Sequence, residues 1–199
     1  MSRTIAPAAL MGLAVFAALP SPALAHVGVG AAAGAAHGFA HPFAGLDHVL
    51  AMVAVGLYAA QLGGRAIWLV PGAFVATMIA GGMLGYAGVP LPMVEQGIGL
   101  SVVAMGLAVA FGVRLPTVAA CALVGLFALF HGHAHGSEGA ALASFLPYAA
   151  GFVAATVLLH MAGVALGFGL NRLGGRIALR AHQAAGLAGA LAGIAILAS

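Results

Sequence analysis

The sequence has very few charged residues. Only 5% of its 199 residues are charged, whereas 64% are hydrophobic, and the mean hydropathy is +1.18. Soluble domains carry about 25% charged residues, so this composition excludes a soluble globular fold. We therefore predict an integral membrane protein of the all-α class, a polytopic bundle of membrane helices.

The chain also lacks lysine and has a single cysteine. Its six basic residues are all arginines, and such sparse positive charge forms no basic patch, so nucleic acid is excluded as a partner. Cys121 cannot form a disulfide within the chain, and we interpret it as a small buried hydrophobic residue. The sequence contains no G-x-x-x-x-G-K-S/T motif, so we do not expect the chain itself to hydrolyse ATP.

Residues 1–25 have the pattern of a secretory signal peptide. Arg3 precedes a short apolar run that Pro7 interrupts, and Ala23-Leu24-Ala25 has the A-x-A form of a cleavage site. The alternative is a first membrane helix that stays attached, but the short, interrupted run favours cleavage. Cleavage predicts His26 as the mature N-terminus outside the cytoplasm, where its α-amine and imidazole can chelate a metal.

Six apolar segments follow a stretch rich in glycine and alanine, and each is close to the roughly 20 residues that span a bilayer. The segments are residues 42–62, 66–86, 92–113, 116–135, 145–170 and 177–198. Pro42, Pro92 and Pro116 stand at segment starts, where the first helical turn tolerates a missing N–H. We therefore predict a single domain at residues 26–199 with six transmembrane helices.

The arginines predict how the bundle is oriented. Arg65, Arg114, Arg172 and Arg176 lie in the connections after the first, third and fifth segments, and Arg180 begins the sixth. Because arginine is enriched in cytoplasmic loops, both mature termini are expected outside. This agrees with an exported N-terminus and predicts a multi-pass protein of the bacterial cytoplasmic (inner) membrane.

Many of the 31 glycines follow the small-xxx-small pattern that lets membrane helices approach closely. Three such pairs are Gly81 with Gly85, Gly163 with Gly167, and Gly189 with Gly193. These glycines indicate closely packed helices rather than a functional site. The four residues Tyr58, Trp68, Tyr86 and Tyr148 lie mostly near segment ends, which is typical of an interfacial aromatic belt.

Two polar stretches interrupt this apolar pattern. The first is His41-Pro-Phe-Ala-Gly-Leu-Asp47-His48, and the second is His131-Gly-His133-Ala-His135-Gly-Ser-Glu138. An aspartate at the centre of a membrane helix is unfavourable by roughly 2.5–3.5 kcal/mol, so such residues are functional candidates. With a rise of about 1.5 Å per residue, Asp47 and His48 lie about 8–9 Å and His131 about 8 Å from the outer face on antiparallel helices, with His41 at the mouth. We therefore expect the two stretches to meet at one depth.

The second stretch has a helical spacing. His131, His135 and Glu138 follow i, i+4, i+7 and share one helix face, whereas His133 points away from that face. Gly132 and Gly136 are expected to allow the helix to unwind there.

Imidazole and carboxylate groups are suitable ligands for divalent ions such as nickel, cobalt, zinc or copper(II), and the absence of thiolates argues against copper(I). The candidate metal ligands are His41, Asp47, His48, His131, His135 and Glu138. Further residues that could extend a metal path are His26, His37, Glu95, His133 and His160. The alternative is that these histidines only cap helices and bond to carbonyls. Two histidine clusters that also contain acidic residues, in a chain with so few polar residues, favour a metal-binding site.

At these residues the chain resembles the HupE/UreJ family of nickel and cobalt permeases. His41-Pro-x-x-Gly-x-Asp47-His48 is similar to the first motif of the family, and Phe130-His131-Gly-x-Ala-His135-Gly-x-Glu138 is similar to the second. The resemblance covers essentially the whole chain and implies uptake of Ni²⁺ or Co²⁺ for urease, hydrogenase or cobalamin. It also implies transport roles for His41, Asp47, His48, His131, His135 and Glu138.

We therefore predict a secondary transporter, not an enzyme, with Ni²⁺ or Co²⁺ as its transported substrate and no permanently bound cofactor. Its expected partners are the divalent ion and the lipid bilayer, and the sequence leaves open whether the chain forms a homo-oligomer. One alternative is an intramembrane metal-dependent enzyme, although no H-E-x-x-H pattern is present. Another is a metal-binding delivery protein that uses the same cluster without transport.

Overall fold

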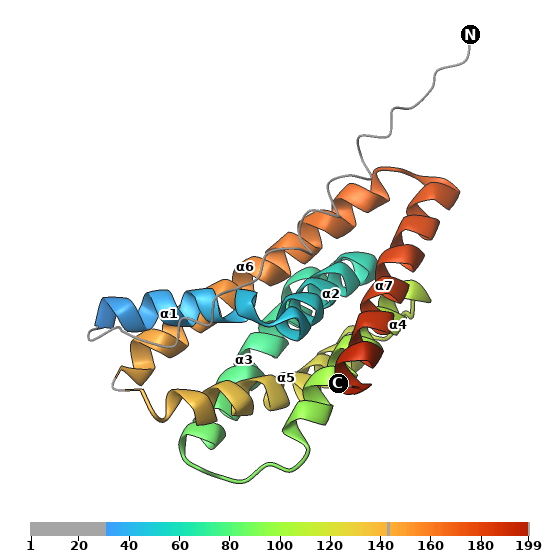
Figure 1. Ribbon diagram of the computed structural model, residues 1–199. Helices are drawn as coiled ribbons and strands as arrows, with labels where there is room; N and C mark the ends of the chain where they lie inside the picture. The colour runs from blue at the N-terminus through green and yellow to red at the C-terminus, as the bar shows by residue number, and fades with distance from the viewer. Residues whose placement is uncertain (1–30, 143, 199) are drawn as a thin grey trace.

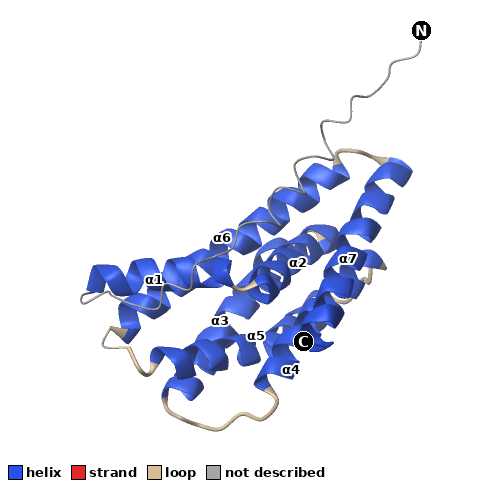
Figure 2. Cartoon of the chain, viewed as in Figure 1, coloured by secondary structure: helices blue, strands red, loops and turns tan. Residues whose placement is uncertain are grey.

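The computed structural model describes residues 31–142 and 144–198, and the secondary structure in those ranges is entirely α-helical (Figures 1 and 2). In chain order the helices are α1 (Ala31–Ala44), α2 (Leu46–Leu62), α3 (Ala66–Tyr86), α4 (Val94–Ala110), α5 (Thr117–Gly139), α6 (Phe145–Asn171) and α7 (Gly175–Ala198). The predicted all-α class is confirmed. The predicted signal peptide at residues 1–25 and His26 lie outside the described residues.

Each of the six predicted segments overlaps one of the helices α2 to α7, and the first also includes the end of α1, but the helices differ in length. In the described part of the chain, α3, α5, α6 and α7 are long and apolar enough to cross a membrane, and the bent pair α1–α2 adds a fifth span if it is counted as one. Helices α2 and α4 have 17 residues each, which is about 26 Å. The structure thus supports a multi-pass membrane protein with four or five spans, and the count of six stays a prediction.

Helix α1 is an element that the sequence pattern did not predict. It continues through Pro42, so this proline lies inside α1 and not at the start of a span. The chain then turns by 83° at Gly45, where the backbone is extended, before α2 begins. Helix α1 lies along the first half of α6 (Figure 1). Side chains at Gly38 and Gly151 would overlap the backbone of the facing helix, which explains the small residues of this segment.

The other helices pack mainly as two pairs, α3 with α5 and α4 with α7, while α2 packs on α6. In the first pair, a side chain at Gly81 would overlap the carbonyl of Leu129 in α5. From the opposite side, side chains at Gly132 and Gly136 would overlap the carbonyls of Met78 and Gly82. Helix α5 is continuous from Thr117 to Gly139, so the expectation that it unwinds at these glycines is wrong. The two glycines instead allow close packing against α3.

The connections lie at two distinct ends of the bundle. A cavity of about 300 Å³ is lined by Gln61, Arg114, Asn171 and His182, so the arginine-bearing connections α2–α3, α4–α5 and α6–α7 share one end. At the other end, the Nε2 atom of His133 lies 2.7 Å from the carbonyl oxygen of Val89 in the α3–α4 connection. Both polar stretches belong to this second end, whose exposure outside the cell remains a prediction.

Candidate metal centre

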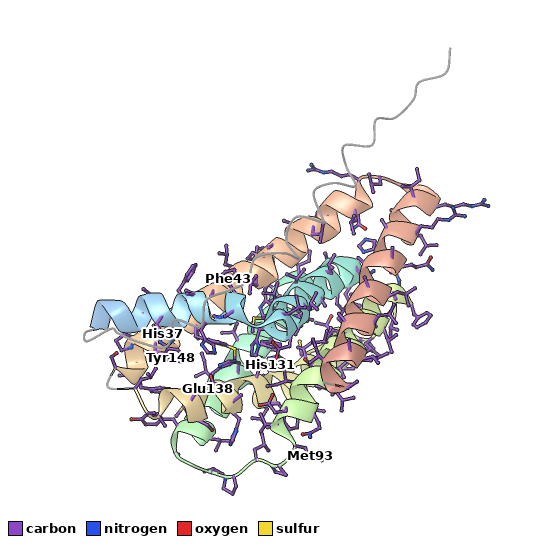
Figure 3. All side chains as sticks on the ribbon, in the orientation of Figure 1. His37, Phe43, Met93, His131, Glu138 and Tyr148 are labelled. Carbon is purple, nitrogen blue, oxygen red and sulfur yellow. The ribbon has the colours of Figure 1, made fainter. Side chains whose placement is uncertain are left out.

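The two polar stretches meet where α1, α2 and α5 converge. Figure 3 labels His131 and Glu138 of the second stretch. His48 at the start of α2 and His135 near the end of α5 are 87 residues apart in sequence, yet their Nε2 atoms face each other within hydrogen-bonding distance. Their ring centroids are 4.5 Å apart. The predicted meeting of the two motifs is thus confirmed, whereas their depth in the membrane stays a prediction.

Each of these two histidines is supported by a carboxylate. The Asp47 Oδ1 atom lies 2.9 Å from His48 Nδ1 and also accepts a 2.9 Å bond from the backbone N–H of His48. The Glu138 Oε2 atom lies 3.2 Å from His135 Nδ1 and 3.2 Å from His41 Nε2. An ionised carboxylate can only accept hydrogen bonds, so each of these three ring nitrogens carries a hydrogen and donates it.

This arrangement determines what the opposite ring nitrogens present. In a neutral imidazole whose Nδ1 carries the hydrogen, Nε2 has a free lone pair. His48 and His135 therefore direct two lone pairs at each other. A hydrogen bond between these nitrogens requires an additional proton, and the same two lone pairs can bind a divalent cation instead. Metal-binding histidines typically donate their second N–H to a carboxylate, a carbonyl or water, and both rings have such a partner.

His131 lies directly beside this pair. Its side chain is fully buried, and its ring centroid is 4.9 Å from that of His48 at an interplanar angle of 88°. Its Nε2 atom is 2.9 Å from Ser101 Oγ of α4. Its Nδ1 atom is buried and has no hydrogen-bond partner within residues 31–142 and 144–198. A third imidazole nitrogen thus remains unpaired within the same group.

A more exposed group lies on the outer side of these three histidines. One ligand atom each from His41, His135 and Glu138 lie within 4.8 Å of one another, an arrangement that can hold a metal ion. The Glu138 side chain is 57% exposed and that of His41 is 32% exposed, whereas His135 is 7% exposed. His135 belongs to both groups, so exposure falls from the outer group to the inner one.

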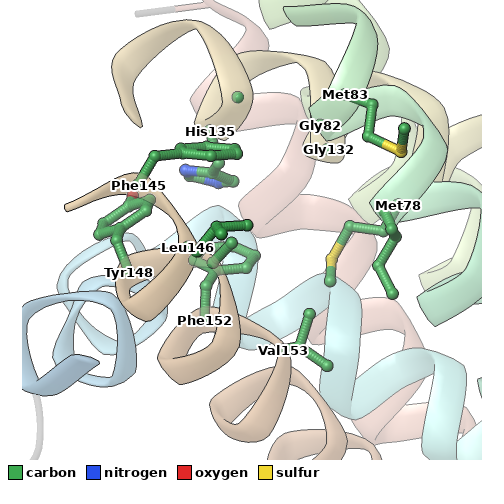
Figure 4. Close-up of a pocket in the computed structure, with 13 residues that line it drawn as sticks. Met78, Gly82, Met83, Gly132, His135, Phe145, Leu146, Tyr148, Phe152 and Val153 are labelled. Carbon is green, nitrogen blue, oxygen red and sulfur yellow. The ribbon is translucent and has the colours of Figure 1, made fainter. Parts of the chain in front are cut away.

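Aromatic and apolar side chains of α6 close one side of the centre. The Phe152 ring lies 4.1 Å from the His135 ring between centroids, and the Tyr148 ring lies 5.8 Å from that of His41. A cavity of about 300 Å³ beside His135 has an almost entirely apolar lining from α3, α5 and α6 (Figure 4). This wall keeps the surroundings of the imidazoles weakly polar on that side.

Three of the more distant candidates lie outside the cluster or at its margin. His133 bonds to the Val89 carbonyl, on a different face of α5 from the ligand candidates. Glu95 is exposed in the first turn of α4, and no ion pair is found for it within the part of the chain that the structure describes. His37 is exposed on α1, and its ring centroid lies 6.0 Å from that of His41.

His160 lies deeper in the bundle. It is fully buried, and neither ring nitrogen has a hydrogen-bond partner among the described residues. The ring of Phe74 lies 4.9 Å from the His160 ring and 5.7 Å from the His131 ring between centroids. An aromatic side chain therefore contacts both His160 and the centre.

Sequence reasoning missed several residues of the centre. Tyr148, which lies beside His41, is buried, so its assignment to an interfacial belt is wrong. The same assignment is wrong for the buried Tyr58 of α2, whereas Trp68 and Tyr86 are exposed. A side chain at Gly45 would overlap Asp47 Oδ1, so this glycine leaves room for the carboxylate. Ser101 was detectable only as the single hydroxyl residue of an apolar helix.

Comparison with known proteins adds independent information. The family described as HupE / UreJ protein matches residues 13–196 of the chain. Protein HupE of Rhizobium leguminosarum bv. viciae is 52% identical over 180 residues, which cover 90% of this chain and 92% of that protein. No solved structure matches the chain.

Proposed function

The chain belongs to the HupE/UreJ family, and from this premise we propose that it is a secondary transporter of Ni²⁺ or Co²⁺. It takes up the ion across the bacterial cytoplasmic membrane for metalloenzymes such as hydrogenase or urease, or for cobalamin. The ion is its substrate, and the chain holds no permanent cofactor and performs no catalysis. The family resemblance recognised in the two motifs is confirmed by both comparisons.

The observation that carries this proposal is the facing pair of imidazole nitrogens, His48 Nε2 and His135 Nε2. Each ring is oriented by its own carboxylate, Asp47 or Glu138. Imidazole and carboxylate ligands suit borderline divalent ions. Two of the three acidic residues in the sequence support these two rings, so the rare charge of this chain is concentrated at the centre.

The gradient of exposure suggests the order of events. Glu138 is exposed and His41 is half-buried, so these two capture the hydrated ion and offset its charge. The buried His48, His131 and His135 then replace water ligands as the ion moves inward. The membrane potential favours inward movement of a divalent cation by about 4.6 kcal/mol per 100 mV.

The test is accumulation of radiolabelled nickel at trace concentration in cells that lack their own nickel importers. We expect wild-type protein to accumulate nickel, and His48→Ala and His135→Ala to reduce initial uptake at least tenfold, because each removes one of the facing ligands. His182→Gln is the matched control, since His182 lies at the opposite end of the bundle and bonds to Asn171. Cobalt and zinc as competitors rank the substrates.

The comparison requires equal amounts of each variant in the membrane. If the wild-type protein accumulates neither nickel nor cobalt above background, the transport proposal is wrong. Tight binding by the purified protein without accumulation would then indicate a delivery protein. Full uptake by both histidine variants would contradict the assignment of the site.

A further inference from the structure

Ser101 makes two hydrogen bonds that together determine its role. Its Oγ atom donates to the carbonyl oxygen of Ile98 at 2.6 Å, in its own helix. The same Oγ atom lies 2.9 Å from His131 Nε2. A serine hydroxyl has a single hydrogen, and the Ile98 carbonyl can only accept, so this hydrogen is used there. Ser101 Oγ must therefore accept the hydrogen bond from His131 Nε2–H.

This donor–acceptor order fixes the tautomer of His131. When Nε2 of a neutral imidazole carries the hydrogen, Nδ1 has the free lone pair. The Nδ1 atom is the ring nitrogen that has no partner in the described ranges. Both side chains are almost completely buried, Ser101 at 1% and His131 at 0% exposure, so bulk water does not compete for this bond.

We propose that Ser101 is a positioning residue of the metal centre, which holds His131 in the tautomer that offers Nδ1 to the ion. This inference rests on the proposed function and adds α4 to the helices that build the site. Ser101 plays the same part for His131 as Asp47 plays for His48 and Glu138 for His135. The difference is that a neutral hydroxyl does this without adding negative charge.

The three supports together determine which ring nitrogens of the three imidazoles stay free. These are His48 Nε2, His131 Nδ1 and His135 Nε2, because the other nitrogen of each ring is committed to a support. Loss of such an outer support lowers metal affinity by about 10–100-fold in metalloproteins. Ser101→Ala removes the acceptor for Nε2–H and allows the Nδ1–H tautomer, which blocks the ligand atom.

The test combines two measurements on purified protein. Nitrogen-15 NMR of histidine-labelled, metal-free protein reports the tautomer, and the His131 signals are identified by their loss in His131→Ala. Isothermal titration calorimetry reports the affinity for Ni²⁺. We expect Nε2–H in wild type, a population of Nδ1–H in Ser101→Ala, and an affinity lower by 10–100-fold. Ser101→Thr, which keeps the hydroxyl, should restore both properties.

Thr156→Val is the matched control. Thr156 is also fully buried and its hydroxyl donates to a carbonyl of its own helix, that of Phe152, at 3.0 Å. It has no ring-nitrogen partner in the described ranges, so this variant should keep both the tautomer and the affinity. Pure Nε2–H in Ser101→Ala with an affinity within twofold of wild type would overturn the proposal.

The tautomer is measured without metal, so it separates this inference from the proposed transport. A shift of the tautomer and a loss of affinity in Ser101→Ala support the role of Ser101 even if cells accumulate no nickel. Wild-type protein that binds neither Ni²⁺ nor Co²⁺ overturns the transport site and, with it, the metal-positioning role. A tautomer shift alone would then show that Ser101 only orients a buried histidine.

Discussion

Glu138 connects two histidines through a single oxygen atom, since His41 Nε2 and His135 Nδ1 both lie 3.2 Å from its Oε2. Glu138→Gln keeps the size of the side chain but removes its negative charge. We expect the affinity for Ni²⁺ to fall by about 10–100-fold, as for other supports of metal-binding histidines. Because the side chain is largely exposed, the melting temperature should change little. Calorimetric titration and thermal unfolding in detergent measure the two effects.

The neighbouring residue gives the control for this change. Ser137 is exposed, and within residues 31–142 and 144–198 its hydroxyl bonds only to the backbone carbonyl of His133, at 2.9 Å. Ser137→Ala should therefore keep the affinity of wild type. Equal affinities of Glu138→Gln and wild type would show that Glu138 does not support the ligands.

At the scale of residues, the sequence predicted the participants better than their contacts. His48 and His135 stood out because polar side chains are rare in a chain this apolar, and the structure shows that these two side chains meet. Which ring nitrogen is free depends on side-chain rotation and on partners from other helices, and spacing along one helix does not encode either. Ser101 escaped prediction because a serine in a helix is satisfied by its own backbone, as Ser101 partly is.

At the scale of helices, the approach of α3 to α5 positions the second motif. Gly132→Ala would place a methyl group against the carbonyl of Met78, so the two helices must separate. We expect a destabilisation of about 1–3 kcal/mol, as for other overpacked sites, and a loss of nickel binding, because His131 and His135 lie on the displaced helix. Thermal unfolding and calorimetric titration on the same sample measure both.

Gly72→Ala in α3 is the control for this substitution. An added methyl group at Gly72 has no neighbour within 4 Å, and alanine is the better helix former by about 0.8–1.0 kcal/mol. This variant should be as stable as wild type or slightly more stable. If Gly132→Ala unfolds at the wild-type temperature and binds nickel normally, close packing at this glycine does not position the site.

The helix bounds predicted from the sequence agree with the structure where a hydrophobic segment is uninterrupted. Helix α3 occupies the predicted residues 66–86, and α6 begins at the predicted residue 145. Helix α1 was missed because its glycine and alanine residues give no hydrophobic period, and its stability comes from packing on α6. The bend at Gly45 depends on that packing too, so His41 was placed on the same helix as His48 although it belongs to α1.

At the scale of the whole molecule, the two ends of the bundle carry different polar side chains, arginines at one end and histidines with carboxylates at the other. Arg65, Arg114 and Arg172 lie at one end, with the connections that line the cavity at His182. The histidine centre and the α3–α4 connection lie at the other. Arginine-rich ends are cytoplasmic by the positive-inside rule, so the centre is expected to face outward. Import requires this arrangement, because capture must precede translocation.

Cysteine labelling of intact cells tests this orientation directly. In a Cys121→Ala background, Ala87→Cys at the end of α3 and Leu173→Cys in the α6–α7 turn place single thiols at opposite ends, both at exposed positions. A membrane-impermeant maleimide should label Ala87→Cys in intact spheroplasts and Leu173→Cys only after permeabilisation. The reverse pattern would place Glu138 and His41 at the cytoplasmic side. Capture would then start from inside, and the same centre would serve export or intracellular delivery in place of uptake.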